Sequence, residues 1–130
     1  MLFRSGPQGT IYATGTIVAG YSDLRLKDVL NVVDNSLERI DNIRGIYYEQ
    51  NETARKLGFN DTERKVGLIA QEVKAVLPEV VVPAPFDVNK YNESISGENY
   101  LTIMYERVVP LLIQALKEQK GQIDYIKNKL

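Results

Sequence analysis

The chain has 130 residues, of which 44% are hydrophobic, and its 16 basic and 17 acidic residues leave a net charge of −1. This length supports one modest core and therefore one domain, and the balanced charge argues against a nucleic-acid-binding protein. The sequence has no cysteine and no histidine, which excludes disulfides, thiolate or histidine metal sites and histidine-dependent triads. No metal or other cofactor is expected. The sequence shows no signal-peptide pattern and no apolar run that could span a membrane, so no membrane partner is expected either.

The first 21 residues differ from the rest of the chain. Residues 9–14 (GTIYAT) are echoed by residues 15–20 (GTIVAG). Thr, Ile, Val and Tyr favour strands, and glycine permits turns or a close backbone approach. The pattern predicts a pair of short strands.

Residues 22–27 (SDLRLK) support two interpretations. In the first, Ser22 or Asp23 is the N-cap of a helix, and its side-chain oxygen accepts a hydrogen bond from a free amide of the first turn. In the second, Ser22 and Lys27 form a catalytic dyad, in which a lysine with a pKa lowered by desolvation takes the proton of the serine hydroxyl. Helix caps are commoner than such dyads, so the spacing alone favours the cap.

A helix is predicted from Asp23 to about Ile43. Its apolar residues recur at spacings of three and four, which gives one apolar stripe. They are Leu26, Val29, Leu30, Val33, Leu37, Ile40 and Ile43. Residues 34–36 (DNS) are a candidate interruption, and the Arg44-Gly45 pair is a stop signal.

The middle of the chain is predicted to alternate short strands with turns. The expected strands are residues 46–49, 65–69, 80–82 and 101–104, the first two forming a hairpin with a helical turn near residues 53–57. A short helix is expected over residues 70–77, where Pro78 ends it. Residues 86–99 are polar and interrupted by Asn, Gly and Ser, which indicates a solvated loop or an exposed hairpin.

A long helix is predicted from Tyr105 to the last residue, with Pro110 in its first turns. Its apolar positions alternate in steps of four and three, as in a coiled coil. The predicted seam contains Leu112, Leu116, Gln119, Ile123, Ile126 and Leu130. Packing of this stripe on the domain's own core is the alternative, but self-association is favoured, and the seam does not decide between a dimer and a trimer.

Five blocks of this chain, taken in order, resemble a known family. They are residues 22–27 (SDLRLK), 45–48 (GIYY), 67–73 (GLIAQEV), 78–81 (PEVV) and 100–105 (YLTIMY). Together they resemble the self-cleaving C-terminal chaperone domain of phage endosialidase tailspikes, a domain that also occurs in phage neck appendages, in tail fibres and in the myelin regulatory factor family. No single block is specific, but the ordered set is.

The resemblance implies an α+β fold and a homotrimer. The expected architecture is short N-terminal strands, a helix, small β-hairpins with a protruding arm, and a long C-terminal coiled-coil helix. Residues 1–21 are then the end of a β-rich fibre stalk, and residues 22–130 are the intramolecular chaperone domain, with its trimerisation helix at about 105–130. The arm corresponds to residues 86–99, where Phe86 and Tyr91 are expected to contact the stalk.

The resemblance also implies one round of self-cleavage. Ser22 is the expected nucleophile and Lys27 the expected base, with the cut at Tyr21–Ser22 as first choice and at Ser22–Asp23 as second. Asp23 and Arg25 are expected to support the site, Asp23 by orienting it and Arg25 by disfavouring a charge on Lys27. Assembly is expected in the host cytoplasm, with the upstream fibre kept in the virion tail and the chaperone domain released.

Two other functions compete with this interpretation. One is a structural trimerisation module at a fibre tip that never cleaves, and the other is a receptor-binding tip that uses residues 86–99. In the first, Ser22 is a cap and Lys27 is a surface charge. Persistence of the domain in the mature particle favours either of them over a released chaperone.

Overall fold

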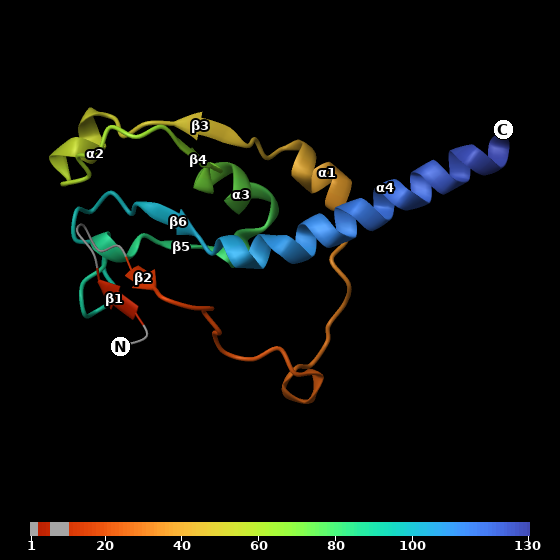
Figure 1. The fold of residues 1–130 in the computed structure, drawn as a ribbon, viewed down its shortest axis with the longest axis horizontal. Coiled ribbons are helices and arrows are strands. Elements are labelled where there is room, and N and C mark those ends of the chain that lie inside the picture. The colour runs from red at the N-terminus through yellow and green to blue at the C-terminus, as the bar shows by residue number, and fades with distance from the viewer. Residues whose placement is uncertain (1–2, 6–10) are drawn as a thin grey trace. The chain divides into compact units, whose positions relative to one another are not determined.

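A computed structural model describes residues 3–5 and 11–130 of the chain. It divides into two compact units, an N-terminal unit of residues 1–31 and 48–65 and a C-terminal unit of residues 32–47 and 66–130. The described elements are small two-stranded sheets, short helices and one long C-terminal helix (Figure 1). The α+β class predicted from the sequence is therefore confirmed.

The N-terminal unit begins with one strand pair. Strand β1 (Phe3–Ser5) pairs antiparallel with β2 (Ile11–Ala13), so that Arg4 lies opposite Tyr12. Strand β2 falls in the first of the two sequence repeats, whose Gly9 and Thr10 lie outside the described residues. Residues 15–20 in the second repeat form no strand.

The helix predicted from Asp23 to Ile43 is wrong. This stretch contains the single 3-10 turn η2 (Leu24–Leu26), then irregular chain, then the six-residue helix α1 (Ser36–Asp41). A helix gains most of its stability by packing its apolar stripe, but Leu30 in this stripe is 90% exposed and has no surface to cover it here. Asn35 has φ 48°, a left-handed conformation that sets the beginning of α1.

The hairpin predicted after Gly45 is confirmed. Strands β3 (Ile46–Tyr48) and β4 (Lys65–Gly67) form a two-stranded sheet. The chain between them carries helix α2 (Glu52–Lys56), whose N-cap Asn51 accepts a hydrogen bond from the Ala54 amide at 2.9 Å.

The C-terminal unit follows the predicted order closely. Helix α3 (Ala70–Val76) ends before the 3-10 turn η3 (Pro78–Val80), and strand β5 (Val81–Pro83) pairs antiparallel with β6 (Leu101–Ile103). The 3-10 turn η5 (Tyr105–Val108) then leads into the long helix α4 (Val109–Lys129). Pro110 stands in the first turn of α4, where its missing N–H is tolerated.

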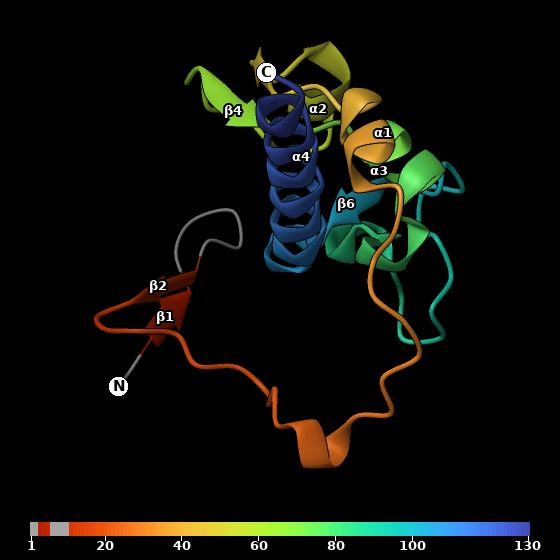
Figure 2. The same cartoon turned by 90° about the vertical axis from the view of Figure 1, so that its right-hand side faces the viewer.

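The core of this unit forms where α3, β6 and the start of α4 meet. Its buried side chains are Val73, Leu77, Val80, Ile103, Val108 and Leu111. Helix α1 lies along α4 and adds the half-buried Ile40 to this cluster (Figure 2). The rest of α4 continues beyond the core.

Residues 84–100 form a compact loop that begins with the 3-10 turn η4 (Pro85–Asp87). Its base is closed by a hydrogen bond from the Ala84 amide to the Tyr100 carbonyl at 2.8 Å, and the Phe86 and Tyr100 rings stack at 5.9 Å. The buried Asp87 carboxylate accepts hydrogen bonds from the Ser94 hydroxyl at 2.7 Å and the Ser96 amide at 2.8 Å. The polar residues that predicted a loop thus build its internal scaffold.

Of the helices in residues 11–130, none combines the length and the apolar character needed to cross a lipid bilayer.

Candidate Ser-Lys site and C-terminal helix

The structure brings Ser22 and Lys27 together. The turn η2 places Lys27 after a reversal of the chain, and the Lys27 amide donates to the Leu24 carbonyl at 3.1 Å. The Lys27 backbone is extended, and its Nζ donates a hydrogen bond to Ser22 Oγ at 2.7 Å. This is the distance needed for proton exchange between a nucleophile and its base. The contact forms across a single turn, without the long helix expected from the sequence.

Asp23, and not Ser22, is the N-cap of this turn. Its Oδ1 accepts from the Arg25 amide at 2.8 Å, and its carboxylate also accepts from Arg25 Nε at 3.1 Å and Nη2 at 2.8 Å. These bonds from Arg25 hold the pKa of Asp23 below its usual range and raise the pKa of Arg25. The Ser22 hydroxyl is thereby left for Lys27.

The Ser-Lys pair is exposed to solvent in this structure. Ser22 and Lys27 are both exposed, and so are the flanking apolar side chains of Tyr21, Leu24 and Leu26. Attack by Ser22 would create an oxyanion, which free backbone amides at a helix start could stabilise. The turn η2 has only three residues, and its Arg25 amide already donates to Asp23, so it offers fewer such amides than a long helix would. The dry pocket that an unprotonated lysine requires is not built by residues 11–130 of one chain.

Helix α4 presents two distinct faces. Leu111 and Ala115 are buried against the C-terminal unit. Each seam position at the start of the helix follows a docked position by one residue, which turns it by about 100° around the helix axis. The apolar seam side chains are exposed, by 47% at Leu112, 65% at Leu116, 47% at Ile123, 58% at Ile126 and 101% at Leu130, and Gln119 is exposed as well.

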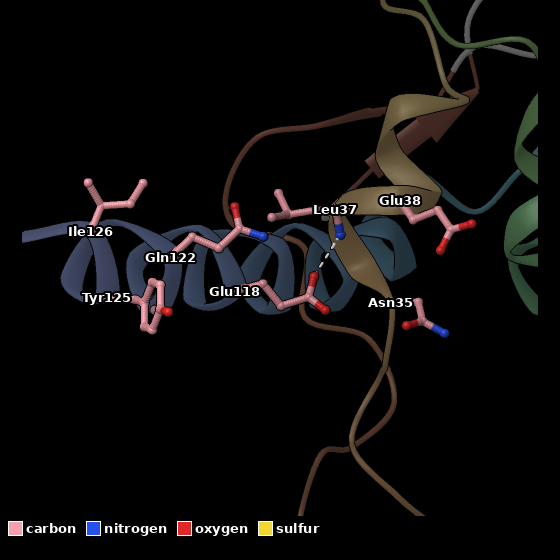
Figure 3. A pocket seen from close by; sticks show the side chains of 8 residues that line it. Asn35, Leu37, Glu38, Glu118, Gln122, Tyr125 and Ile126 are labelled. Carbon is pink, nitrogen blue, oxygen red and sulfur yellow. Dashed lines mark hydrogen bonds between the residues drawn. The ribbon is translucent and has the colours of Figure 1, made fainter. Parts of the chain in front are cut away.

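Glu118 is a residue that sequence reasoning missed. Its Oε1 accepts from the Ser36 amide at 3.1 Å. Its Oε2 accepts from the Leu37 amide at 2.7 Å, as Figure 3 shows. The carboxylate from α4 therefore caps α1, where Asn35 makes no side-chain cap of its own. An open groove of about 630 Å³ lies between the two helices and is also lined by Gln122 and Tyr125. No spacing signal could have found a contact across 82 residues.

Glu72, in the AQEV block of α3, is a second structural anchor. It accepts from the Arg44 amide at 3.1 Å and from Arg44 Nε at 2.9 Å and Nη2 at 2.6 Å. Those bonds from Arg44 lower the pKa of Glu72 and raise that of Arg44. The sequence predicted a short helix here and gave no role to Glu72. Across residues 3–5 and 11–130, no group of three acidic side chains is arranged to hold a metal ion.

Comparison with known proteins finds a family match for the segment that contains Ser22 and Lys27. Residues 22–82 match the family model described as chaperone of endosialidase. The chain is 28% identical over 109 residues to the long tail fiber protein Gp37 of Enterobacteria phage K3, which covers 84% of this chain and 8% of that protein. It is 30% identical over 134 residues to Gp37 of Enterobacteria phage M1, covering 99% of this chain and 49% of the relative.

A similar segment occurs outside phages. The chain is 31% identical over 133 residues to myelin gene regulatory factor-like A of Dictyostelium discoideum, which covers 95% of this chain and 13% of that protein. The chain thus spans at most about half the length of each of these three relatives. A similar segment is thus found both in phage tail-fibre proteins and in a myelin gene regulatory factor-like protein.

Proposed function

We propose that this chain is the chaperone end of a phage tail-fibre protein, because residues 22–82 match the chaperone of endosialidase family. It forms a homotrimer, assists the folding of an upstream β-rich stalk of the same chain and releases itself by cutting next to Ser22. The tail-fibre relatives support the context, and the 2.7 Å contact between Lys27 Nζ and Ser22 Oγ carries the chemistry.

The proposed reaction is one intramolecular acyl transfer. Lys27, once it has lost its ammonium proton, takes the proton of the Ser22 hydroxyl. The Ser22 oxygen attacks the carbonyl carbon of Tyr21, the peptide C–N bond breaks, and the amine of Ser22 receives the proton. Water then hydrolyses the resulting ester, leaving a carboxylate on Tyr21 and a new chain beginning at Ser22.

Timing follows from solvation. A lysine acts as a base only as the neutral amine, a form that removal of water favours, and both members of the pair are exposed in the single chain. Cleavage therefore waits until assembly removes water from the pair and favours the neutral amine. This order lets the trimer align three stalk segments, whose pairing is otherwise slow and prone to aggregation, before the chaperone leaves.

Intact mass tests the cleavage. The chain carrying its upstream stalk is expressed as the parent and as the variants Ser22→Ala and Lys27→Ala, and each is weighed under native conditions. We expect a fragment beginning at Ser22 from the parent alone, and a fragment beginning at Asp23 would move the cut to the second bond. A parent that stays whole while assembled would reduce Ser22 to a structural residue.

The exposed seam of α4 supports self-association. Ile123 in the seam and Ile113 outside it are exposed to almost the same extent, 47% and 48%, so they form a matched pair. We expect Ile123→Glu to lower the molar mass measured by light scattering from trimer to monomer, and Ile113→Glu to leave the trimer intact. Equal effects of the two substitutions would reject the seam.

Coupling between the two activities has its own test. The monomeric Ile123→Glu variant is expected to cleave far more slowly than the trimeric Ile113→Glu control, because its Ser22 and Lys27 side chains stay exposed to solvent. Full-rate cleavage in a monomer would show that assembly does not control the reaction.

The second candidate function is a module that never cleaves. The exposure of Ser22 and Lys27 favours it, and so does the compact loop of residues 84–100, which presents the exposed side chains of Tyr91 and Ile95 as a receptor-binding tip would. Such a module stays on the mature particle. Mass spectrometry of purified virions distinguishes the two functions, since a released chaperone leaves no peptides from residues 86–99.

A further inference from the structure

The turn that joins Ser22 to Lys27 has little to hold it. It consists of three residues, and its backbone bonds run from the Leu26 amide to the Asp23 carbonyl at 3.0 Å and from the Lys27 amide to the Leu24 carbonyl at 3.1 Å. None of the turn's residues is buried. A single exposed 3-10 turn is marginal in water, because two hydrogen bonds do not offset the entropy of fixing the chain.

The Asp23 carboxylate supplies the missing restraint. Its Oδ1 accepts from the Arg25 amide at 2.8 Å, which fixes the backbone two residues ahead. The same carboxylate receives the Arg25 guanidinium through two further bonds, at 3.1 and 2.8 Å. A planar, two-bond fork is the most directional ion pair available to a protein, so it fixes geometry even on the surface.

The fork also decides what Arg25 can do. Its positive charge is matched by the carboxylate 2.8 Å away, so the pair as a whole is neutral toward Lys27. The other charged side chain next to Lys27 in sequence is the exposed Asp28, which adds a negative charge. In this arrangement Arg25 therefore serves as the counterion of Asp23.

We propose that Asp23 is a positioning residue: by capping the Leu24–Leu26 turn it holds Lys27 Nζ against Ser22 Oγ, and Arg25 is its counterion rather than an activator of Lys27. The inference rests on the proposed self-cleavage. Asp23 acts through the turn and touches neither reacting atom. Arg25 holds the pKa of Asp23 below its usual range, so the cap is a carboxylate at every pH at which a lysine can serve as base.

The test compares cleavage rates across pH for Asp23→Ala, Asp23→Asn and Arg25→Gln in the assembled chain. Removing a cap typically weakens a turn about fivefold, so we expect Asp23→Ala to lower the rate constant about fivefold at every pH without moving the midpoint of the pH profile. Asn retains the capping oxygen and is expected to stay within about twofold of the parent. Arg25→Gln is expected to leave the midpoint in place.

A midpoint that rises in Arg25→Gln with the plateau rate unchanged would overturn the proposal, because it would show that Arg25 destabilises the charged lysine. A parental rate in Asp23→Ala would overturn it as well.

A second readout keeps the inference separate from the proposed function. In the uncleavable Ser22→Ala background, backbone NMR shifts of residues 23–27 report the turn whether or not the parent ever cleaves. We expect Asp23→Ala to move them to random-coil values and Asp23→Asn to preserve them. A turn that survives Asp23→Ala refutes the positioning role, whereas loss of the turn in a protein that never cleaves refutes only the enzymatic function.

Discussion

Glu118 offers the sharpest test of how the C-terminal unit is held together. Replacing it with alanine leaves the amides of Ser36 and Leu37, now bonded at 3.1 and 2.7 Å, without a partner at the start of α1. A hydrogen bond to a charged group contributes about 1.5–3 kcal/mol, and loss of a helix cap costs about 0.5–2 kcal/mol. Since both bonds are only partly buried, we expect Glu118→Ala to lower the free energy of unfolding by about 2–3 kcal/mol.

The measurement is urea unfolding followed by circular dichroism at one fixed protein concentration, because self-association would otherwise change the apparent stability. Glu118→Gln retains one acceptor oxygen and is expected to lose about half as much. Lys117→Ala, an exposed neighbour on the same helix, is the matched control and is expected to stay within about 0.5 kcal/mol of the parent. If Glu118→Ala behaves like this control, the carboxylate does not cap α1.

Three further predictions concern buried or anchored polar groups. Asp87→Ala should lower the thermal midpoint by several degrees, because the carboxylate organises its loop; hydrogen bonding from Ser94 lowers the pKa of Asp87, so its stabilising effect is present at neutral pH and is lost on acidification through that lowered pKa. Glu72→Gln should weaken the anchor to Arg44 and lower the thermal midpoint at neutral pH. Because bonding from Arg44 lowers the pKa of Glu72, the stabilising effect of Glu72 in the parent should also be lost on acidification through that lowered pKa. Ser36→Ala should leave stability unchanged or raise it by about 1 kcal/mol in urea unfolding, because the buried Ser36 hydroxyl has no partner among the described residues; a clear loss would mean that the assembled protein supplies one.

Sequence alone located the elements whose limits are set by local chemistry. The hairpin of β3 and β4, the helix α3 that ends before Pro78, and the long helix α4 were all predicted within a few residues. In each case a glycine, a proline or a sustained apolar period acts over one or two turns of chain, and the structure adds little that such a period does not already specify.

The failed helix shows where that reasoning stops. Residues 23–43 carry a helical apolar period, but a period says only which side chains would share a face, not whether a surface exists to receive them. Ile40 lies in α1 and packs against the core, whereas Val29 and Leu30 are 69% and 90% exposed in irregular chain. β-branched valines close to Leu30 also lose rotamer freedom in a helix, which removes the remaining local support.

The candidate site divides in the same way. The spacing of Ser22 and Lys27 allowed a pair but favoured a helix cap, and the resemblance to the family was what pointed to the pair; the structure shows the two side chains in contact. The cap by Asp23 was one of two alternatives, and only the structure assigns it. The Glu118 cap was unpredictable, because it depends on how α4 lies against α1 and leaves no trace in sequence spacing.

The proposed mechanism requires two exposed apolar surfaces of this chain to be covered, namely the seam of α4 and the two leucines beside Lys27, and assembly can cover both. The seam residues of α4 are exposed in the single chain, and in the proposed trimer their burial drives association. The exposed Leu24 and Leu26 flank Lys27, so any surface that covers these two leucines also removes water from the amine. Free energy gained by burying apolar area in the trimer can thus offset the cost of a neutral, desolvated lysine. On this argument, polar substitutions at Leu24 and Leu26 should slow cleavage without dissociating the trimer, whereas a substitution in the seam should abolish both.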